Sequence, residues 1–139
     1  MIDKERIKKE IIDLERYMQR IGSMLPESKE KYLRSEMVVK NAIERNVQLI
    51  SDKEFDLLAL LHKGLSESLP GNEISMLDQL KGHLGEGVTV SIRDRRALRN
   101  MLVHAYSDAS YDDQVYSQAK DLDDVKKLVS EAKKIISKK

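Results

Sequence analysis

A short basic segment between positions 93 and 104 carries the residues best suited to chemistry. It contains four arginines, at positions 93, 95, 96 and 99, followed by Asn100 and His104. Histidine can hold or release a proton near neutral pH, and a guanidinium can bind two oxygens of one phosphate. Only Asp94 opposes the arginines, so the local charge is about +3, whereas the whole chain has a formal net charge of +1. The segment therefore indicates a local phosphate-binding surface.

The other two histidines are weaker candidates. His62 comes shortly before Gly64, near the expected end of a helix, where a cation is ordinary. His83 lies beside Gly82 in a similar setting. No two histidines have the i, i+4 spacing of a zinc-binding helix, and the chain has no cysteine. The sequence therefore predicts no metal site, no disulfide and no cysteine nucleophile.

The composition is typical of one helical domain. The chain has 139 residues, 40% of them hydrophobic, which suits a single domain over residues 1–139 with an aliphatic core. Only 4% are aromatic and two are proline, which favours helices over sheets. No apolar run reaches the ~18–20 residues of a membrane span, and positions 3–6 are charged, unlike a signal peptide. We therefore expect a cytoplasmic protein with no membrane partner.

Apolar residues recur at helical spacing in five segments, which must position the basic surface. The segments run from Ile7 to about Leu25, from Ser28 to Gly64, from Asn72 to Leu84, from Ser91 to about Tyr106, and from Asp112 or Asp113 to about Ile136. We expect an all-α, up-and-down bundle of four to five helices.

Capping and breaking residues suggest the helix ends. Pro26 should end the first helix, and Asn72 should cap the third. Gly85 and Gly87 should end that third helix, and the fourth should open at an approximate capping box, Ser91 with Asp94. The second segment has no Gly or Pro and is expected to be one helix, although the step at Ser51–Asp52 leaves a break with a new N-cap as the alternative.

The helical arrangement of the fourth segment decides which residues can face a ligand. At about 100° per residue, with Leu98 at zero, Met101, Leu102 and Ala105 fall between roughly −60° and 40°, and we expect them to be buried. The opposite face, from roughly 60° to 240°, is basic and polar around one apolar residue, and it comprises Arg95, Arg99, Val103, Arg96, Asn100 and His104. Arg99 and His104 lie about 140° and 7.5 Å apart. They can reach one phosphate only through the long stem of the arginine or with help from another chain. A second copy across this helix would also cover Val103, so we expect a homodimer.

The string from Arg99 to Tyr106 reads Arg-Asn-Met-Leu-Val-His-Ala-Tyr. An arginine, four residues, a histidine, one residue and a tyrosine resembles the signature of the HepT-like toxins in the HEPN superfamily. The asparagine after the arginine, the aliphatic residue before the histidine and the position on the next-to-last helix strengthen the resemblance. The stretch from Ala42 to Ile50 also looks like the long helix of that family.

This resemblance implies a metal-independent ribonuclease that acts as a homodimer and needs no cofactor. It implies that the protein is the toxin of a type VII-like toxin–antitoxin pair. The implied partner is a nucleotidyltransferase antitoxin, which silences the toxin by transferring AMP to the tyrosine equivalent to Tyr106. The implied catalytic residues are Arg99 and His104. Arg95 and Arg96 are outside the signature, but their charge makes them candidate RNA-binding residues.

The chemistry of these residues agrees with that assignment. RNA carries its own nucleophile, the 2′-hydroxyl, so cleavage needs a group that moves its proton and a cation that steadies the phosphorane. His104 suits the first task and Arg99 the second, while Asn100 could orient the imidazole or the substrate. We expect a 2′,3′-cyclic phosphate and a 5′-hydroxyl as products, and no cleavage of DNA.

Two other interpretations stay open at this point. The chain could be a helical binding module that docks a nucleotidyltransferase or a nucleotide without cutting RNA, or a purely structural helical dimer. Arginines on a helix surface are more often solvated or ion-paired than catalytic, and Val103 could pack within its own bundle. The tyrosines outside the signature, Tyr111 included, are assigned to packing.

Overall fold

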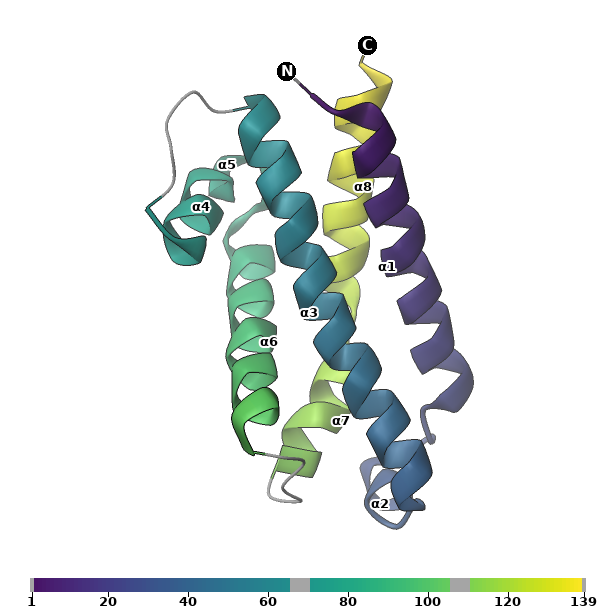
Figure 1. Ribbon diagram of the computed structural model, residues 1–139. Helices are drawn as coiled ribbons and strands as arrows, with labels where there is room; N and C mark the ends of the chain where they lie inside the picture. The colour runs from purple at the N-terminus through teal and green to yellow at the C-terminus, as the bar shows by residue number, and fades with distance from the viewer. Residues whose placement is uncertain (1, 66–70, 106–110, 139) are drawn as a thin grey trace.

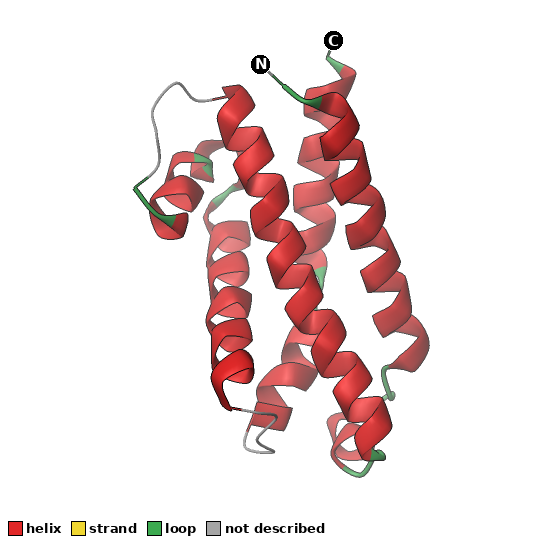
Figure 2. Ribbon diagram, in the orientation of Figure 1, coloured by secondary structure: helices red, strands yellow, loops and turns green. Residues whose placement is uncertain are grey.

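The computed structural model describes residues 2–65, 71–105 and 111–138, and every regular element in these ranges is an α-helix (Figure 2). The helices are α1 (Lys4–Met24), α2 (Lys29–Leu33), α3 (Met37–Leu65), α4 (Glu73–Gln79), α5 (Lys81–Leu84), α6 (Glu86–Ala105), α7 (Asp112–Lys120) and α8 (Asp123–Ser137). The predicted all-α fold is confirmed.

The long helices run side by side in alternating directions (Figure 1). They are α1, α3, α6 and the successive pair α7 and α8. Helix α1 packs against α3 and α8, and α6 packs against the same two helices, which closes the bundle. The short α2 lies at the end opposite the two termini, and α4 and α5 lie beside the upper parts of α3 and α6. This is the up-and-down topology expected from the sequence.

Helix α1 ends where the sequence predicts, but it begins at Lys4, three residues before the expected Ile7. The side chain of Asp3 accepts a hydrogen bond from the backbone N–H of Arg6 at 3.2 Å, which caps the first turn. Leu25, before Pro26, is extended with φ −70° and ψ 123°. Four apolar residues of α1 spaced by three, four and seven positions are buried: Ile7, Ile11, Leu14 and Ile21.

The second segment is not one helix, and its break is not at Ser51–Asp52. Both of these residues lie inside α3, while the chain turns between α2 and α3 at residues 34–36. Tyr32 explains the turn, because its fully buried ring lies 5.6 Å, centroid to centroid, from the ring of Tyr116 on α7. Packing against a distant helix therefore bends a segment that contains no Gly or Pro.

Helix α6 starts earlier than predicted. Gly85 ends α5 with a positive φ of 91°, a conformation that favours glycine, and α6 begins at the next residue. Ser91 and Asp94 lie within α6, so the expected capping box is wrong, and Gly87 belongs to α6 instead of ending the helix before it. The extra length adds residues 86–90, which include the buried Thr89, to the helix that carries the candidate site.

Of the remaining predicted helix boundaries, the start of α4 is confirmed, whereas the last segment forms two helices. Asn72 caps α4 as predicted, and its side chain accepts from the backbone N–H of Ser75 at 2.9 Å. The last segment divides into α7 and α8 at residues 121–122, and Tyr111 occupies the position before α7, with Asp112 in its first turn.

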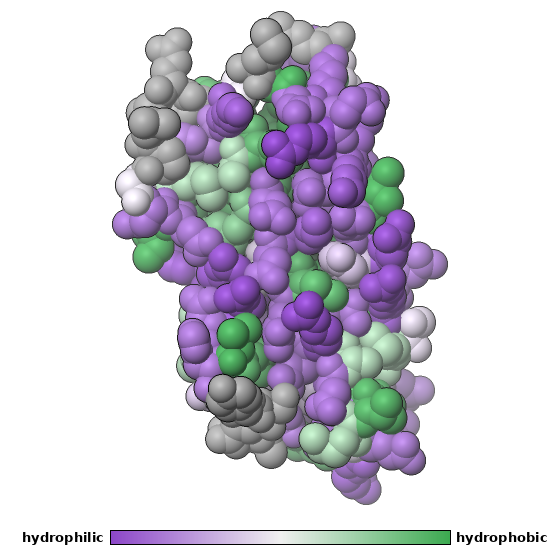
Figure 3. All heavy atoms as spheres, viewed as in Figure 1, coloured by the Kyte–Doolittle hydropathy of each residue, from purple (hydrophilic) through white to green (hydrophobic). Residues whose placement is uncertain are grey.

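One aliphatic core runs through the bundle, with the described surface largely polar around it. Residues such as Ile43, Leu57, Ile92 and Leu128 are fully buried in it. The face in Figure 3 is mostly hydrophilic, with separate hydrophobic patches. Among the described helices, none is long and apolar enough to cross a bilayer.

Candidate functional site

Arg99 lies at the edge between α6 and α3. Its Nε is 2.9 Å from Oδ1 of Asp52 on α3, and its Nη1 donates a hydrogen bond to Oδ1 of Asn100 at 3.2 Å. The side chain is 28% exposed. Arg99 is therefore an accessible cation that is held from one side by a carboxylate and from the other by an amide.

His104 lines a shallow surface hollow. The hollow has a volume of about 330 Å³ and is lined by Asn100, Met101, His104 and Tyr111. Asn100 and His104 are one helical turn apart on α6, so their side chains are neighbours. Asn100 thus contacts Arg99 and also lines the hollow that holds His104.

Arg96 is engaged with two carboxylates and an aromatic ring. Its Nε donates to Oε1 of Glu73 at 3.0 Å and its Nη1 to Oδ1 of Asp52 at 2.9 Å, while Nη2 donates to the second oxygen of Glu73. The guanidinium carbon lies 4.8 Å from the centre of the Phe55 ring. The hydrogen bonds to Glu73 raise the pKa of Arg96. These contacts tie α4 to α3 and α6.

Arg95 is inside the protein, and the expectation that it faces outward is wrong. Its side chain is 1% exposed and contacts Glu54 on α3 and Asp124 on α8. Burial alone would lower the pKa of Arg95, but the two carboxylates raise it above its ordinary value. An RNA phosphate cannot reach a guanidinium in this position, so Arg95 contributes to the fold and not to an RNA surface.

The buried face of α6 explains this error. The upstream residues Val88 and Ile92 lie at about 80° and 120° from Leu98 on a helical wheel, and Ile92 is fully buried. The buried sector is therefore centred near roughly 60°, the direction of Arg95. Met101, expected to be buried, lies outside this sector and is 38% exposed. Placing Ile92 on the same helical wheel as Leu98 would have indicated the correct face.

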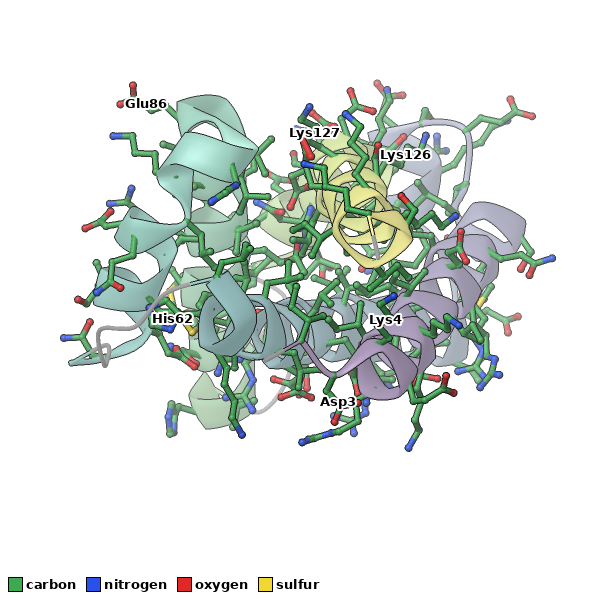
Figure 4. All side chains as sticks on the ribbon, turned by 90° about the horizontal axis from the view of Figure 1, so that it is seen from above. Asp3, Lys4, His62, Glu86, Lys126 and Lys127 are labelled. Carbon is green, nitrogen blue, oxygen red and sulfur yellow. The ribbon has the colours of Figure 1, made fainter. Side chains whose placement is uncertain are left out.

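The outward placement of the remaining residues agrees with the prediction. Asn100 and His104 are exposed, and Val103 is 42% exposed. Tyr106, the candidate modification site, lies outside the described residues. The histidine His62 is buried on the α4 side of α3 (Figure 4), where its Nε2 donates to Oε1 of Gln79. His62 therefore packs inside the bundle, and the sequence had already made it a weak candidate for the site.

Three residues of this region had no signal in the sequence. Asp52 and Glu73 both contact Arg96, although they lie 44 and 23 positions before it in the sequence. No spacing rule connects residues so far apart. Tyr111 was assigned to packing, yet it lines the hollow beside His104. An excess of arginine on one helix implied that carboxylates elsewhere would balance it, but not which ones.

The described residues contain no group of three or more His, Cys, Asp or Glu side chains arranged to hold a metal ion. The arrangement present is an accessible guanidinium, an amide and an imidazole on one exposed stretch of an α-helical bundle. In general, a guanidinium can bind a phosphate group and an imidazole can act as a general acid or base.

Comparison with known families identifies the class. The family model described as Ribonuclease HepT-like matches residues 14–132, which is most of the chain. The chain therefore belongs to the HepT-like ribonuclease family of the HEPN superfamily, as the string from Arg99 to Tyr106 suggested. No match is found among the curated proteins or among the solved structures.

Proposed function

We propose that this protein is a metal-independent endoribonuclease that acts as the toxin of a type VII-like toxin–antitoxin pair. The observation that supports it best is the position of Asn100, which hydrogen-bonds Arg99 and lines the hollow of His104. A phosphate held by Arg99 would thus lie near an imidazole, with the amide between them. Membership of the HepT-like ribonuclease family supports RNA as the substrate.

In the proposed reaction, His104 takes the proton of a ribose 2′-hydroxyl and the 2′-oxygen attacks the adjacent phosphorus. The bond from phosphorus to the 5′-oxygen then breaks, and that oxygen leaves as a 5′-hydroxyl after receiving a proton. Arg99 stabilises the extra negative charge on the phosphorane through its Nη groups. Asn100 orients Arg99 and the substrate, and the other product carries a 2′,3′-cyclic phosphate.

We propose that two copies of the chain meet across the exposed stretch of α6. Met101 and Val103 are 38% and 42% exposed there, on either side of Asn100 and His104 around the helix. Covering these apolar side chains with a second copy would bury them and bring two sets of Arg99 and His104 to one groove. One imidazole could then take the 2′-proton while the other protonates the leaving oxygen.

The proposed partner is a nucleotidyltransferase antitoxin that modifies Tyr106. In this step the phenol oxygen of Tyr106 attacks the α-phosphorus of ATP, and pyrophosphate leaves. An AMP group two positions beyond His104 on the chain would add bulk and negative charge near the residues that receive RNA. The resemblance of the string from Arg99 to Tyr106 to the HepT-like signature supports this assignment.

The experiment is an RNA cleavage assay with the purified full chain in EDTA. Intact mass is measured first, because a chain that already carries AMP should be inactive. We expect wild type to cut RNA, to leave the matching DNA intact and to produce 2′,3′-cyclic phosphate ends. His104→Ala and Arg99→Ala should each lower the rate by about 10²–10⁴-fold.

Two matched variants serve as controls. His83→Ala removes an exposed histidine at the end of α5, and Arg45→Ala removes an exposed arginine on α3; both should retain wild-type rates. Dependence on an added metal ion would reject metal independence. An unmodified wild type that does not cut RNA but binds a nucleotidyltransferase would instead support the non-catalytic binding module.

A further inference from the structure

Asp52 is the acidic residue that contacts both Arg96 and Arg99 of α6. One of its carboxylate oxygens, Oδ1, lies 2.9 Å from Nη1 of Arg96 and 2.9 Å from Nε of Arg99. The carboxylate is 34% exposed, so it lies at the edge of the site. It is the point at which the rigid helix α3 contacts the proposed phosphate clamp.

The two arginines depend on Asp52 to different degrees. Arg96 also has two contacts with Glu73 and lies over the Phe55 ring, so it has other anchors. Within the part of the chain that the structure describes, Arg99 makes one further polar contact, the hydrogen bond to its neighbour Asn100. Its Nε is shielded from solvent without an aligned hydrogen-bond acceptor, so the nearby charge of Asp52 is what compensates it. Loss of Asp52 should therefore release Arg99 and leave Arg96 in place.

The position of Asp52 also determines which edge of Arg99 can bind a phosphate. A guanidinium has donors along its Nε side and at its Nη end. Asp52 occupies the Nε side, so a phosphate must approach the Nη end, on which Asn100 already accepts from Nη1. Asn100, which accepts at this end, also lines the hollow with His104.

We infer that Asp52 is a positioning residue of the proposed ribonuclease site, which holds Arg99 so that its Nη end faces the substrate phosphate. The catalytic role of Asp52 rests on the proposed function, whereas its role in holding Arg99 rests on the ion pair alone. It acts through Arg99, because Asp52 itself would repel a phosphate.

The first test measures cleavage kinetics of Asp52→Asn in the full chain. We expect a loss of about 10-fold to 100-fold that falls mainly on kcat, because a misplaced guanidinium still attracts RNA but no longer meets the transition state. Asp56→Asn is the matched control, since Asp56 is one turn further along α3, 61% exposed, and 4.0 Å from Lys53. That control should keep wild-type kinetics.

A double-mutant cycle separates positioning from a general loss of structure. If Asp52 acts through Arg99, Asp52→Asn should change the residual rate of the Arg99→Ala protein by less than about threefold. If the two substitutions instead lowered the cleavage rate independently, so that their fold-losses multiplied in the double mutant, the inference would be overturned. Asp52→Glu keeps the negative charge but moves it, so this variant should fold like wild type and show an intermediate loss of cleavage rate. It replaces Asp52→Asn in the test if Asp52→Asn unfolds.

A second measurement needs no RNA. The exchange of the Arg99 Nε proton with water is followed by NMR, with its signal assigned by its absence in Arg99→Lys. We expect exchange to be several-fold faster in Asp52→Asn and unchanged in Asp56→Asn. Unchanged exchange in Asp52→Asn would overturn the inference. An inactive wild type would overturn the ribonuclease proposal alone, because this measurement still shows whether Asp52 holds Arg99.

Discussion

Arg95 and Asp124 form a two-pronged ion pair inside the bundle. Nη2 of Arg95 donates to Oδ1 of Asp124 at 2.9 Å, and Nη1 donates to the other carboxylate oxygen. Nη1 also donates to Oε1 of Glu54 at 3.0 Å, and Nη2 to the backbone carbonyl of Asp121 at 3.2 Å. One buried guanidinium thus connects α6 to α3 and to the start of α8, beneath the candidate site.

Arg95→Ala should strongly destabilise the protein. Removing the cation leaves the carboxyl groups of Glu54 and Asp124 buried without it, a change that typically costs about 3–5 kcal/mol. The free energy of unfolding from urea titration measures the loss. Arg93→Ala, an exposed arginine on the same helix, should stay within about 0.5 kcal/mol of wild type. Equal stability of the two variants would contradict the structural role of Arg95.

Glu54→Gln should change the pH dependence of stability. Burial raises the pKa of Glu54 well above its ordinary value; the charge of Arg95 opposes this and that of Asp124 adds to it. The folded state therefore holds this proton more tightly than the unfolded chain. The resulting stabilisation is complete below the unfolded pKa, near 4.5, and is lost as the pH rises through the folded pKa.

Glutamine does not titrate, so the unfolding free energy of Glu54→Gln minus that of wild type should increase as the pH rises from about 4.5 through the folded pKa. The slope cannot exceed about 1.4 kcal/mol per pH unit for one proton. Urea titrations at several pH values measure it. Glu27→Gln, at an exposed position on the surface, should give a flat difference. A flat difference for Glu54→Gln as well would show that its proton is not retained on folding.

Val103→Glu should separate the proposed dimer and abolish RNA cleavage together. Val103 is 42% exposed between the residues of the site, and a charge there would be buried against a second copy. Sedimentation and the cleavage assay measure the two effects. Val38→Glu is the control, because Val38 is 69% exposed near the start of α3. A dimeric Val103→Glu protein would place the interface elsewhere.

Glu73→Gln should loosen α4 without unfolding the bundle. The change weakens the paired contact with Arg96, and we expect a loss of at most about 1 kcal/mol because this pair is partly exposed. Amide hydrogen exchange should be faster in residues 73–79 and unchanged in α1. Glu86→Gln, whose partner Lys81 is 3.7 Å away at the surface, provides the comparison. Unaltered exchange in α4 would show that Glu73 does not anchor it.

Tyr106→Phe should leave RNA cleavage largely intact but make it insensitive to the nucleotidyltransferase and ATP. The phenol oxygen is the proposed AMP acceptor, and phenylalanine lacks it. Intact mass and residual cleavage after incubation measure the effect, with Tyr17→Phe on α1 as the control that is still silenced. Continued silencing of Tyr106→Phe would move the modification to another residue.

The sequence alone was sufficient for the fold class and for part of the site. Helical spacing of apolar residues, with few aromatics and prolines, predicted the bundle, and Pro26 and Asn72 marked two helix boundaries correctly. The same spacing placed Asn100, Val103 and His104 on the outside of α6. These features depend on neighbours within a few turns, so local rules suffice.

Contacts between distant helices were decided only by the tertiary structure. Arg95 and Arg99 differ by about 40° on the helical wheel, yet one is enclosed by carboxylates of α3 and α8 and the other is accessible. Asp52 and Tyr32 likewise have their roles because α6 and α7 pack beside them. A wheel gives angles around one axis, whereas burial depends on which partners surround that axis, and those partners come together only on folding.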